Sequence, residues 1–328
     1  MTRALVPLLI ALSAVALAAA LLIGATPLPL ERALPALFGA GAPGDRIVMQ
    51  DIRLPRAAAA YLFGAALGLC GAALQGLLRN PLAEPGVLGV SATASLFATA
   101  TIFWGFAAAS PIVAPLAAIA GALAATALLS AVALRIGSIV TLILIGVGLS
   151  SFAGAAMSVM LNMAPNPFTL FDLINWTQGS VAHRSIADLA ASTPFLVAGG
   201  AVLFAARRGL SALTVGEEAA AGLGLDLTRL RLAVIAGAGL ATGAAVSLAG
   251  AIGFVGIVAP HMVRPFVAHD PARTLAPAAL LGGALVTLAD IIVRIAPTPS
   301  EMKLGVVVAL IGAPAFVWIA ARRRGGDG

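Results

Sequence analysis

Long apolar blocks, separated by short clusters of proline, glycine and charge, dominate this chain. Each block holds roughly 20 predominantly apolar residues, the length that a helix needs to cross a bilayer. Hydrocarbon offers no partner for an open backbone group, so each block is expected to be helical. The pattern predicts spans near 4–24, 57–78, 88–108, 112–134, 139–162, 189–206, 231–250, 254–268, 275–293 and 304–321. We therefore predict an all-α polytopic membrane protein with about ten transmembrane helices in a compact bundle.

Composition supports one membrane domain over the whole chain, residues 1–328. Charged residues make up 10% and the mean hydropathy is +1.06, whereas soluble domains hold about 25% charged residues. No stretch has the composition of a soluble domain, an acidic tail or a low-complexity linker. The first 25 residues resemble a signal peptide, but the apolar run 4–23 is longer than a usual signal core. We expect it to remain as the first span.

The charge balance is basic, with 19 Lys and Arg against 13 Asp and Glu. In a soluble protein this excess would suggest a nucleic-acid partner; here arginines beside apolar spans mark loops and lipid surfaces, so nucleic acid is not expected. The triplet 322–324 favours a cytoplasmic C-terminus. Ten spans then place the N-terminus in the cytoplasm too, with twelve basic residues inside and seven outside.

Lys303 is the only lysine, and it follows Met302 rather than a glycine. A phosphate-binding loop of the G-x-x-x-x-G-K-[ST] kind is therefore absent from the sequence, so any ATP that drives this chain is hydrolysed by a separate subunit. The single Cys70 allows no disulfide within the chain and no cysteine zinc site. The three histidines show no metal-ligand spacing, so neither a metal nor a cofactor is expected.

Two polar segments interrupt the apolar pattern. Residues 80–86 (NPLAEPG) hold two prolines and a glycine, which exclude a regular helix. The segment either lines a cavity or pathway within protein or forms a tight turn at the membrane surface. Residues 216–224 (GEEAAAGLG) predict a short surface helix with acids at its start and glycines at its end. A helix this short is not stable alone and needs a docking partner. The alternative, a solvated connector, is disfavoured because it would leave Leu223 exposed to water.

Three arginines, Arg53, Arg56 and Arg294, fall on the outer side in the ten-span model. They either receive acidic groups of an external partner or extend to lipid phosphates.

The glycine patterns Gly64-x-x-x-Gly68 and Gly239-x-x-x-Gly243 allow close helix approach, either at a dimer seam or, as we favour, inside one bundle. The stretches 64–81 and 243–260 look alike, which indicates either inverted repeats or a shared glycine bias.

The motifs occur in the order of a known family. They are R-L-P-R (53–56), L-Q-G-L-L-R-N-P-L-A-E-P (74–85), L-G-V-S (88–91), W-x-x-G-S (176–180), G-E-E-A-A-x-x-L-G (216–224), A-G-x-I-G-F-V-G-I-V-x-P-H-x-V-R (249–264), A-D-x-x-x-R (289–294) and I-G-A-P-x-F (311–316). Together they resemble the FecCD-type permeases, the membrane subunits of ABC importers for iron-siderophores, haem and cobalamin. One departure is the stretch 300–305 (SEMKLG), where many members have Glu-Leu-Pro-hydrophobic-Gly.

The resemblance implies a type II ABC importer permease in the bacterial inner membrane, paired with a second copy of itself. It also implies two cytosolic ATP-binding subunits and a periplasmic binding protein as partners. The coupling-loop residues would be Gly216, Glu217, Glu218, Ala219, Leu223 and Gly224. The inner gate would include Asn80, Leu82 and Ser138, and the arginines above would receive the binding protein.

The predicted function is therefore import driven by partner subunits, without catalytic residues in this chain. The alternative is an ion-driven secondary transporter, which needs intramembrane acids. Only Asp290 comes close to that requirement, because Glu84 and Asp188 border loops. An intramembrane hydrolase is disfavoured, since Ser150 lacks the flanking glycine of a nucleophile motif. The sequence does not separate siderophore, haem and cobalamin as substrates.

Overall fold

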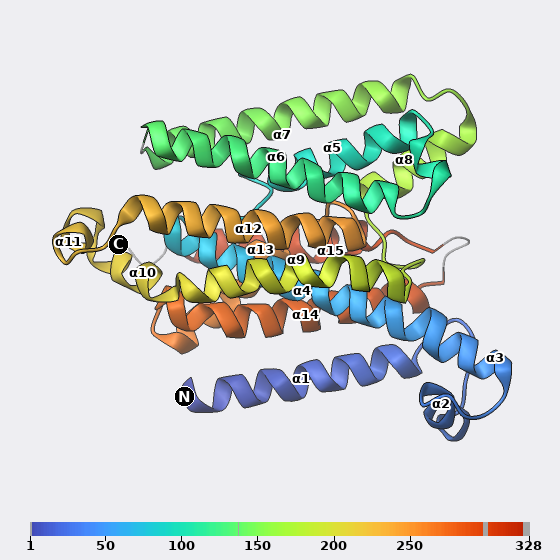
Figure 1. Ribbon diagram of the computed structural model, residues 1–328. Helices are drawn as coiled ribbons and strands as arrows, with labels where there is room; N and C mark the ends of the chain where they lie inside the picture. Colours follow the sequence, from blue (N-terminus) through green and yellow to red (C-terminus); the bar gives the residue numbers. More distant parts are fainter. Residues whose placement is uncertain (1, 137, 298–300, 324–328) are drawn as a thin grey trace.

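The structure is a computed structural model that describes residues 2–136, 138–297 and 301–323, so Ser300 and Arg324 of the sequence motifs lie outside the described residues. The described chain forms one bundle of roughly parallel and antiparallel helices (Figure 1). The long helices are α1 (Thr2–Leu22), α4 (Leu54–Leu77), α5 (Val90–Phe103), α6 (Val113–Ile136), α7 (Ile139–Asn162), α9 (Ile186–Ala205), α12 (Leu227–Ala249), α14 (Pro271–Ile295) and α15 (Leu304–Arg323). Shorter helices are α2 (Leu30–Leu37), α3 (Pro43–Arg46), α8 (Pro167–Gln178), α10 (Arg207–Ala212), α11 (Glu217–Gly222) and α13 (Val255–Val263).

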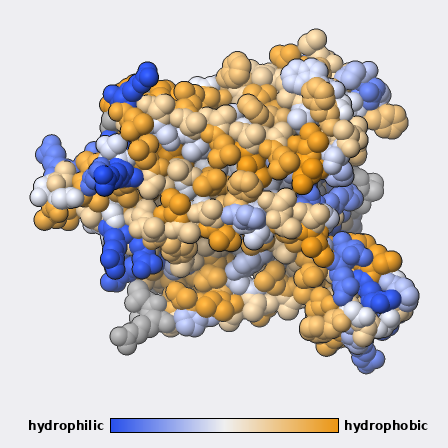
Figure 2. Space-filling view, in the orientation of Figure 1, coloured by the Kyte–Doolittle hydropathy of each residue, from blue (hydrophilic) through white to orange (hydrophobic). Residues whose placement is uncertain are grey.

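The outer surface of the bundle suits a bilayer. Hydrophilic residues gather at its two ends, and the side between them is hydrophobic (Figure 2). Among the described residues, seven helical runs are long and apolar enough to cross a membrane: Ala4–Leu22, Pro43–Leu78, Val113–Ile136, Ile139–Asn162, Ile186–Ala205, Leu227–Ala249 and Pro271–Ile295. Apolar helices Val90–Phe103, Val255–Val267 and Leu304–Pro314 are shorter. The all-helical prediction is confirmed, whereas the number of about ten spans is not.

Small residues allow the central helices α4, α12 and α14 to pack closely. A Cβ added to Gly64 would lie 2.2 Å from the backbone oxygen of Gly282, and one added to Gly68 would lie equally close to that of Ala278. On the other side, the place of a Gly239 Cβ is taken by the Thr126 side chain of α6. Both glycine patterns therefore serve packing within this chain, as backbones approach only where side chains are absent.

Two irregular segments interrupt the centre of the bundle and lie against each other. The first separates α4 from α5, and the second, residues 250–254, separates α12 from α13. A Cβ at Gly256 would lie 3.2 Å from the Cβ of Glu84, so the start of α13 contacts the first segment. The second break comes at Gly250 and Phe254, both with positive φ, and Pro260 lies inside α13. The break falls between the predicted spans 231–250 and 254–268, and Pro260 is accommodated within α13.

The start of α4 also differs from the prediction. Arg53-Leu54-Pro55-Arg56 was expected to precede the second span, but helix α3, the π-helical turn η1 (Ile47–Arg53) and α4 form one continuous helical run. Pro55 lies where the π-helical turn passes into α4 and the hydrogen-bond pattern of the backbone changes. Arg53 and Arg56 thereby lie on a helix rather than in a surface loop.

Candidate functional site

The loop around α11 stands out from one end of the bundle (Figure 1). Glu217, in the first turn of α11, accepts hydrogen bonds from Arg231 of α12, the shorter at 2.8 Å, which fixes the helix to the bundle. Gly216 precedes it with φ 102°, a conformation that favours glycine. Leu223 is 80% exposed and Val215 is 60% exposed. A held helix with open apolar neighbours has the character of a docking surface.

A hollow of about 730 Å³ lies beside this loop and joins two segments that the sequence placed far apart. It is lined by Ser138, by Arg79 at the end of α4, and by residues 215–219 and Arg231. Ser138 begins α7, where its hydroxyl oxygen accepts a hydrogen bond from Thr141 N at 3.3 Å. The structure thus brings the predicted gate residue Ser138 next to the predicted coupling loop.

The other two predicted gate residues lie in the turn that follows α4. The Asn80 side-chain oxygen accepts a hydrogen bond from the backbone N–H of Leu82 at 2.9 Å. Leu82 is 43% exposed, whereas Ala83 next to it is buried. Both residues adjoin the hollow in sequence through Arg79, but neither of them lines it. Their assignment to a gate stays a prediction.

An ion cluster occupies the opposite end of α4 and α14. Asp290 is completely buried and accepts hydrogen bonds from Arg56, at 2.8 Å, and from Arg294, at 2.8 Å. Arg56 also pairs with Glu301, which precedes α15. Two cations and two carboxylates therefore balance each other where α4, α14 and the start of α15 meet. Asp290 is already paired, which weakens its case as a free ion-binding carboxylate.

Arg53 and Arg294 also tie the first helix to this end. The Arg53 guanidinium donates to the backbone oxygens of Leu21, at 2.8 Å, and of Leu22, at 2.9 Å. Arg294 donates to Ala20 O at 2.6 Å, so the C-terminal carbonyls of α1 are satisfied by arginine. All three predicted docking arginines have partners within this chain, and their role toward a binding protein stays a prediction.

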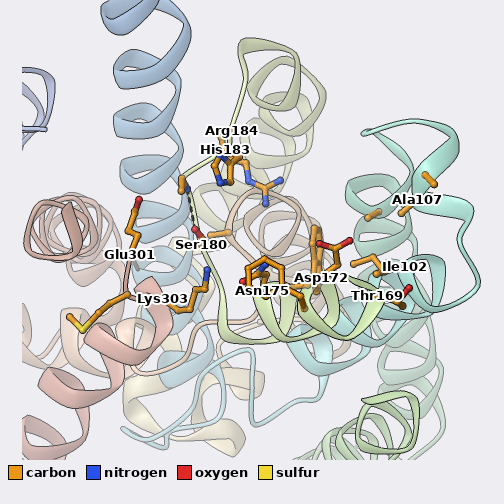
Figure 3. A pocket seen from close by; sticks show the side chains of 18 of the residues that line it. Ile102, Ala107, Thr169, Asp172, Asn175, Ser180, His183, Arg184, Glu301 and Lys303 are labelled. Atoms are coloured by element: carbon orange, nitrogen blue, oxygen red, sulfur yellow. Dashed lines mark hydrogen bonds between the residues drawn. The ribbon is translucent and has the colours of Figure 1, made fainter. Parts of the chain in front are cut away.

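A second polar region, which sequence reasoning did not single out as a site, surrounds α8. We call it the α8 pocket: a cavity of about 500 Å³ lined from α8, from the loop 180–184, from the end of α12 and from residues 301–303. Figure 3 shows Arg184, from the loop after α8, and Lys303, from the segment before α15, near the Asp172 and Asn175 side chains of α8. The motif at 176–180 and the unusual Lys303 were visible in the sequence, but their convergence was not.

Aromatic rings orient the two cations of the α8 pocket. The Arg184 guanidinium carbon lies 5.7 Å from the ring centre of Trp176, and the Lys303 ammonium lies 5.9 Å from that of Phe171. Both distances suit a cation–π contact. Burial lowers the pKa of the Arg184 guanidinium, because the charged form loses water. Within the described ranges, no three His, Cys, Asp or Glu residues are grouped to hold a metal ion.

Known proteins match this arrangement along nearly the whole chain. The model of the FecCD transport family matches residues 10–322. The vitamin B12 import system permease protein BtuC of Vibrio cholerae is 38% identical over 87% of this chain and 86% of its own. The ferric enterobactin transport system permease protein FepD of Escherichia coli is 37% identical over 99% of this chain and 98% of its own.

A solved structure extends the likeness to the fold. It is described as an inward-facing conformation of a proposed metal-chelate type ABC transporter, and it is 28% identical to this chain with a TM-score of 0.87. The match covers 98% of this chain and 99% of that one, so the helices follow the same order and arrangement. With sequence and structure alike over almost every residue, this chain belongs to the FecCD transport family.

Proposed function

We propose that this chain is the membrane subunit of a binding-protein-dependent ABC importer, which carries an iron chelate, such as a ferric siderophore or haem, or cobalamin into the cell. The observation that carries the proposal is the family match over residues 10–322, shared with permeases for vitamin B12 and ferric enterobactin. Partner subunits hydrolyse the ATP, and a periplasmic binding protein delivers the solute. The chain itself performs no catalysis.

The α11 loop is the surface that receives the ATP-binding subunit in this proposal. Its helix is held by the Glu217–Arg231 pair, while Glu218, Ala219 and Leu223 remain exposed. Ser138 and the loop line the same hollow, so a movement of the loop would change the surroundings of the start of α7. Nucleotide in the partner then shifts the permease between two open states through contacts that differ between them.

The proposed topology has ten crossings in the cytoplasmic membrane with both termini in the cytoplasm. Helix α1 begins and α15 ends at the end of the bundle that carries α11, which an even number of crossings requires (Figure 1). Helix α5, with 14 residues, rises about 21 Å and falls short of the hydrocarbon thickness. The irregular segments before α5 and α13 complete these crossings, since buried protein surrounds them.

A second permease copy completes the pathway in this proposal. Helix α7 supports it, because large apolar side chains along its length remain exposed in the single chain. Leu144 is 64% exposed and Phe152 is 69% exposed. Lipid would cover such a face equally well. The proposal of a second permease copy therefore rests on the resemblance to the family and not on this face alone.

Reconstitution tests the proposal directly. The purified chain is placed in vesicles with its ATP-binding subunits and binding protein, and uptake of labelled ferric siderophore and cobalamin is followed. Uptake is expected only when both ATP and the partners are present. Uptake by the chain alone, driven by a proton or sodium gradient, would establish the secondary-transporter alternative instead.

The coupling surface is tested by one added charge. Leu223→Asp is expected to abolish co-purification of the ATP-binding subunit, because an apolar contact at a docking surface is replaced by a carboxylate. Thr228→Asp, at an exposed position near the start of α12, adds the same charge outside the loop and serves as the control. Equal co-purification of both variants would show that the α11 loop does not receive the ATP-binding subunit.

A further inference from the structure

The α8 pocket contains buried polar atoms that have no partner. Trp176 is 9% exposed and lines the pocket, yet its Nε1–H has no acceptor among the described residues. The Nε–H of Arg184 and the side-chain oxygen of Asn175 are likewise buried and unpartnered. A buried donor left unpaired costs the full loss of its water contacts. Such atoms are stable when a ligand supplies what they lack.

The missing partner is mainly an acceptor. Trp176 and Arg184 present N–H donors, and the Asn175 amide presents either its oxygen or its NH₂ after rotation by a half-turn. A single group with two acceptor oxygens satisfies two neighbouring donors at once. A carboxylate has this form, and hydrogen bonds to it are stronger than those to a neutral carbonyl.

The charges around the pocket favour the same ligand. Lys303 forms no ion pair within the part of the chain that the structure describes, and its ammonium lies 5.9 Å from the centre of the Phe171 ring. Glu301, two residues before it, is engaged by Arg56 of the ion cluster. Asp172 is the one lining carboxylate that forms no ion pair among the described residues, against two cations, Arg184 and Lys303. Asp188, which does not line the pocket, attracts Arg184 from outside it, so Lys303 is the lining cation whose charge is least compensated toward an entering solute.

We propose that the α8 pocket binds a carboxylate of the transported solute, with Arg184 and Lys303 as its cationic partners and Trp176 as a further donor. The inference rests on the proposed import function and narrows it to chelates that carry free carboxylates. In the proposed topology the pocket lies at the outer mouth, where a delivered solute arrives first.

A binding measurement on the permease alone tests this site. The full chain in lipid nanodiscs carries Trp104→Phe and Trp318→Phe, so that Trp176 alone reports by fluorescence. Citrate serves as the anionic probe and its neutral triethyl ester as the matched control. Citrate is expected to change the fluorescence saturably, and the ester is expected to have no effect. The affinity for citrate is expected to fall as salt rises, because charge drives the contact.

Single substitutions then locate the cations. Lys303→Gln and Arg184→Gln are each expected to weaken citrate binding about tenfold, as loss of a charged hydrogen bond does. Lys303→Arg restores the charge and is expected to bind citrate nearly as the parent does. Arg32→Gln, which removes an exposed cation paired with Asp45 near the same end, is the control and should leave binding unchanged.

Two outcomes overturn the site: absence of saturable citrate binding, or equal binding by Lys303→Gln, Arg184→Gln and Arg32→Gln. The import proposal is judged separately by ATP-dependent uptake in the reconstituted system. Citrate binding without any ATP-dependent uptake would retain the site and refute the importer. ATP-dependent uptake, together with citrate binding that neither Lys303→Gln nor Arg184→Gln weakens, would retain the importer and refute the site.

Discussion

Replacement of Asp290 by asparagine should destabilise the bundle more than any other change of one carboxylate. Asp290 has no exposed surface, and its two oxygens receive Arg56 at 2.8 Å and Arg294 at 2.8 Å. Asparagine keeps the shape of the side chain but loses the charge. The asparagine NH₂ group would also face one of the two guanidinium groups. Both groups are hydrogen-bond donors, so the strong hydrogen bond at that position is lost.

The size of the effect follows from the burial of the partners. Removal of one member of a buried ion pair costs about 3–5 kcal/mol, since the remaining charge is left without water or partner. Glu301 still pairs with Arg56, so the lower part of this range, about 3 kcal/mol, is expected for Asp290→Asn. The α4, α14 and α1 contacts near the cluster would loosen together, because Arg294 also binds the end of α1.

The assay compares two aspartates that differ in burial. Unfolding is followed in mixed micelles with a rising fraction of denaturing detergent, for the parent, Asp290→Asn and Asp226→Asn. Asp226 pairs with Arg229 on the surface, where the side chains are 51% and 88% exposed, and asparagine remains a good N-cap there. A loss below about 1 kcal/mol is expected for this control. If both variants lose the same free energy of unfolding, burial of the cluster does not determine its contribution.

Two further experiments test other parts of the structure. Gly64→Ala places a Cβ 2.2 Å from the backbone oxygen of Gly282 and should lower the free energy of unfolding by about 1–3 kcal/mol. In the control, Gly148→Ala, the added Cβ meets no atom within 4 Å, so the free energy of unfolding should fall little or not at all. Equal effects of the two substitutions would contradict close packing of α4 against α14. Cys70 is completely buried and should react with a maleimide only after unfolding; rapid labelling of the folded protein would place it elsewhere.

Much of the fold follows from short-range properties of the sequence. Each of the ten predicted apolar blocks corresponds to a helix, because a run of apolar side chains in hydrocarbon leaves its backbone no other way to satisfy its hydrogen bonds. The short helix at 217–222 was also predictable, from acids at its start and glycines at its end. These signals lie within a few residues of one another, so no knowledge of distant partners is needed.

The sites depended on partners that the sequence does not reveal. Arg56 meets Asp290 across 234 positions, and no local pattern indicates that a cation beside a span is paired inside the bundle. The α8 pocket likewise joins Arg184 to Lys303 through the packing of α8 against the start of α15.

The sequence by itself determined that this chain is a helical membrane protein without its own phosphate-binding loop, because hydrophobicity and residue type are local facts. Only the tertiary structure decided which charges neutralise one another and which remain unpaired in a cavity. The reason is physical: the free energy of a buried charge depends on the atoms within a few ångströms of it, and folding brings those atoms together from remote parts of the chain.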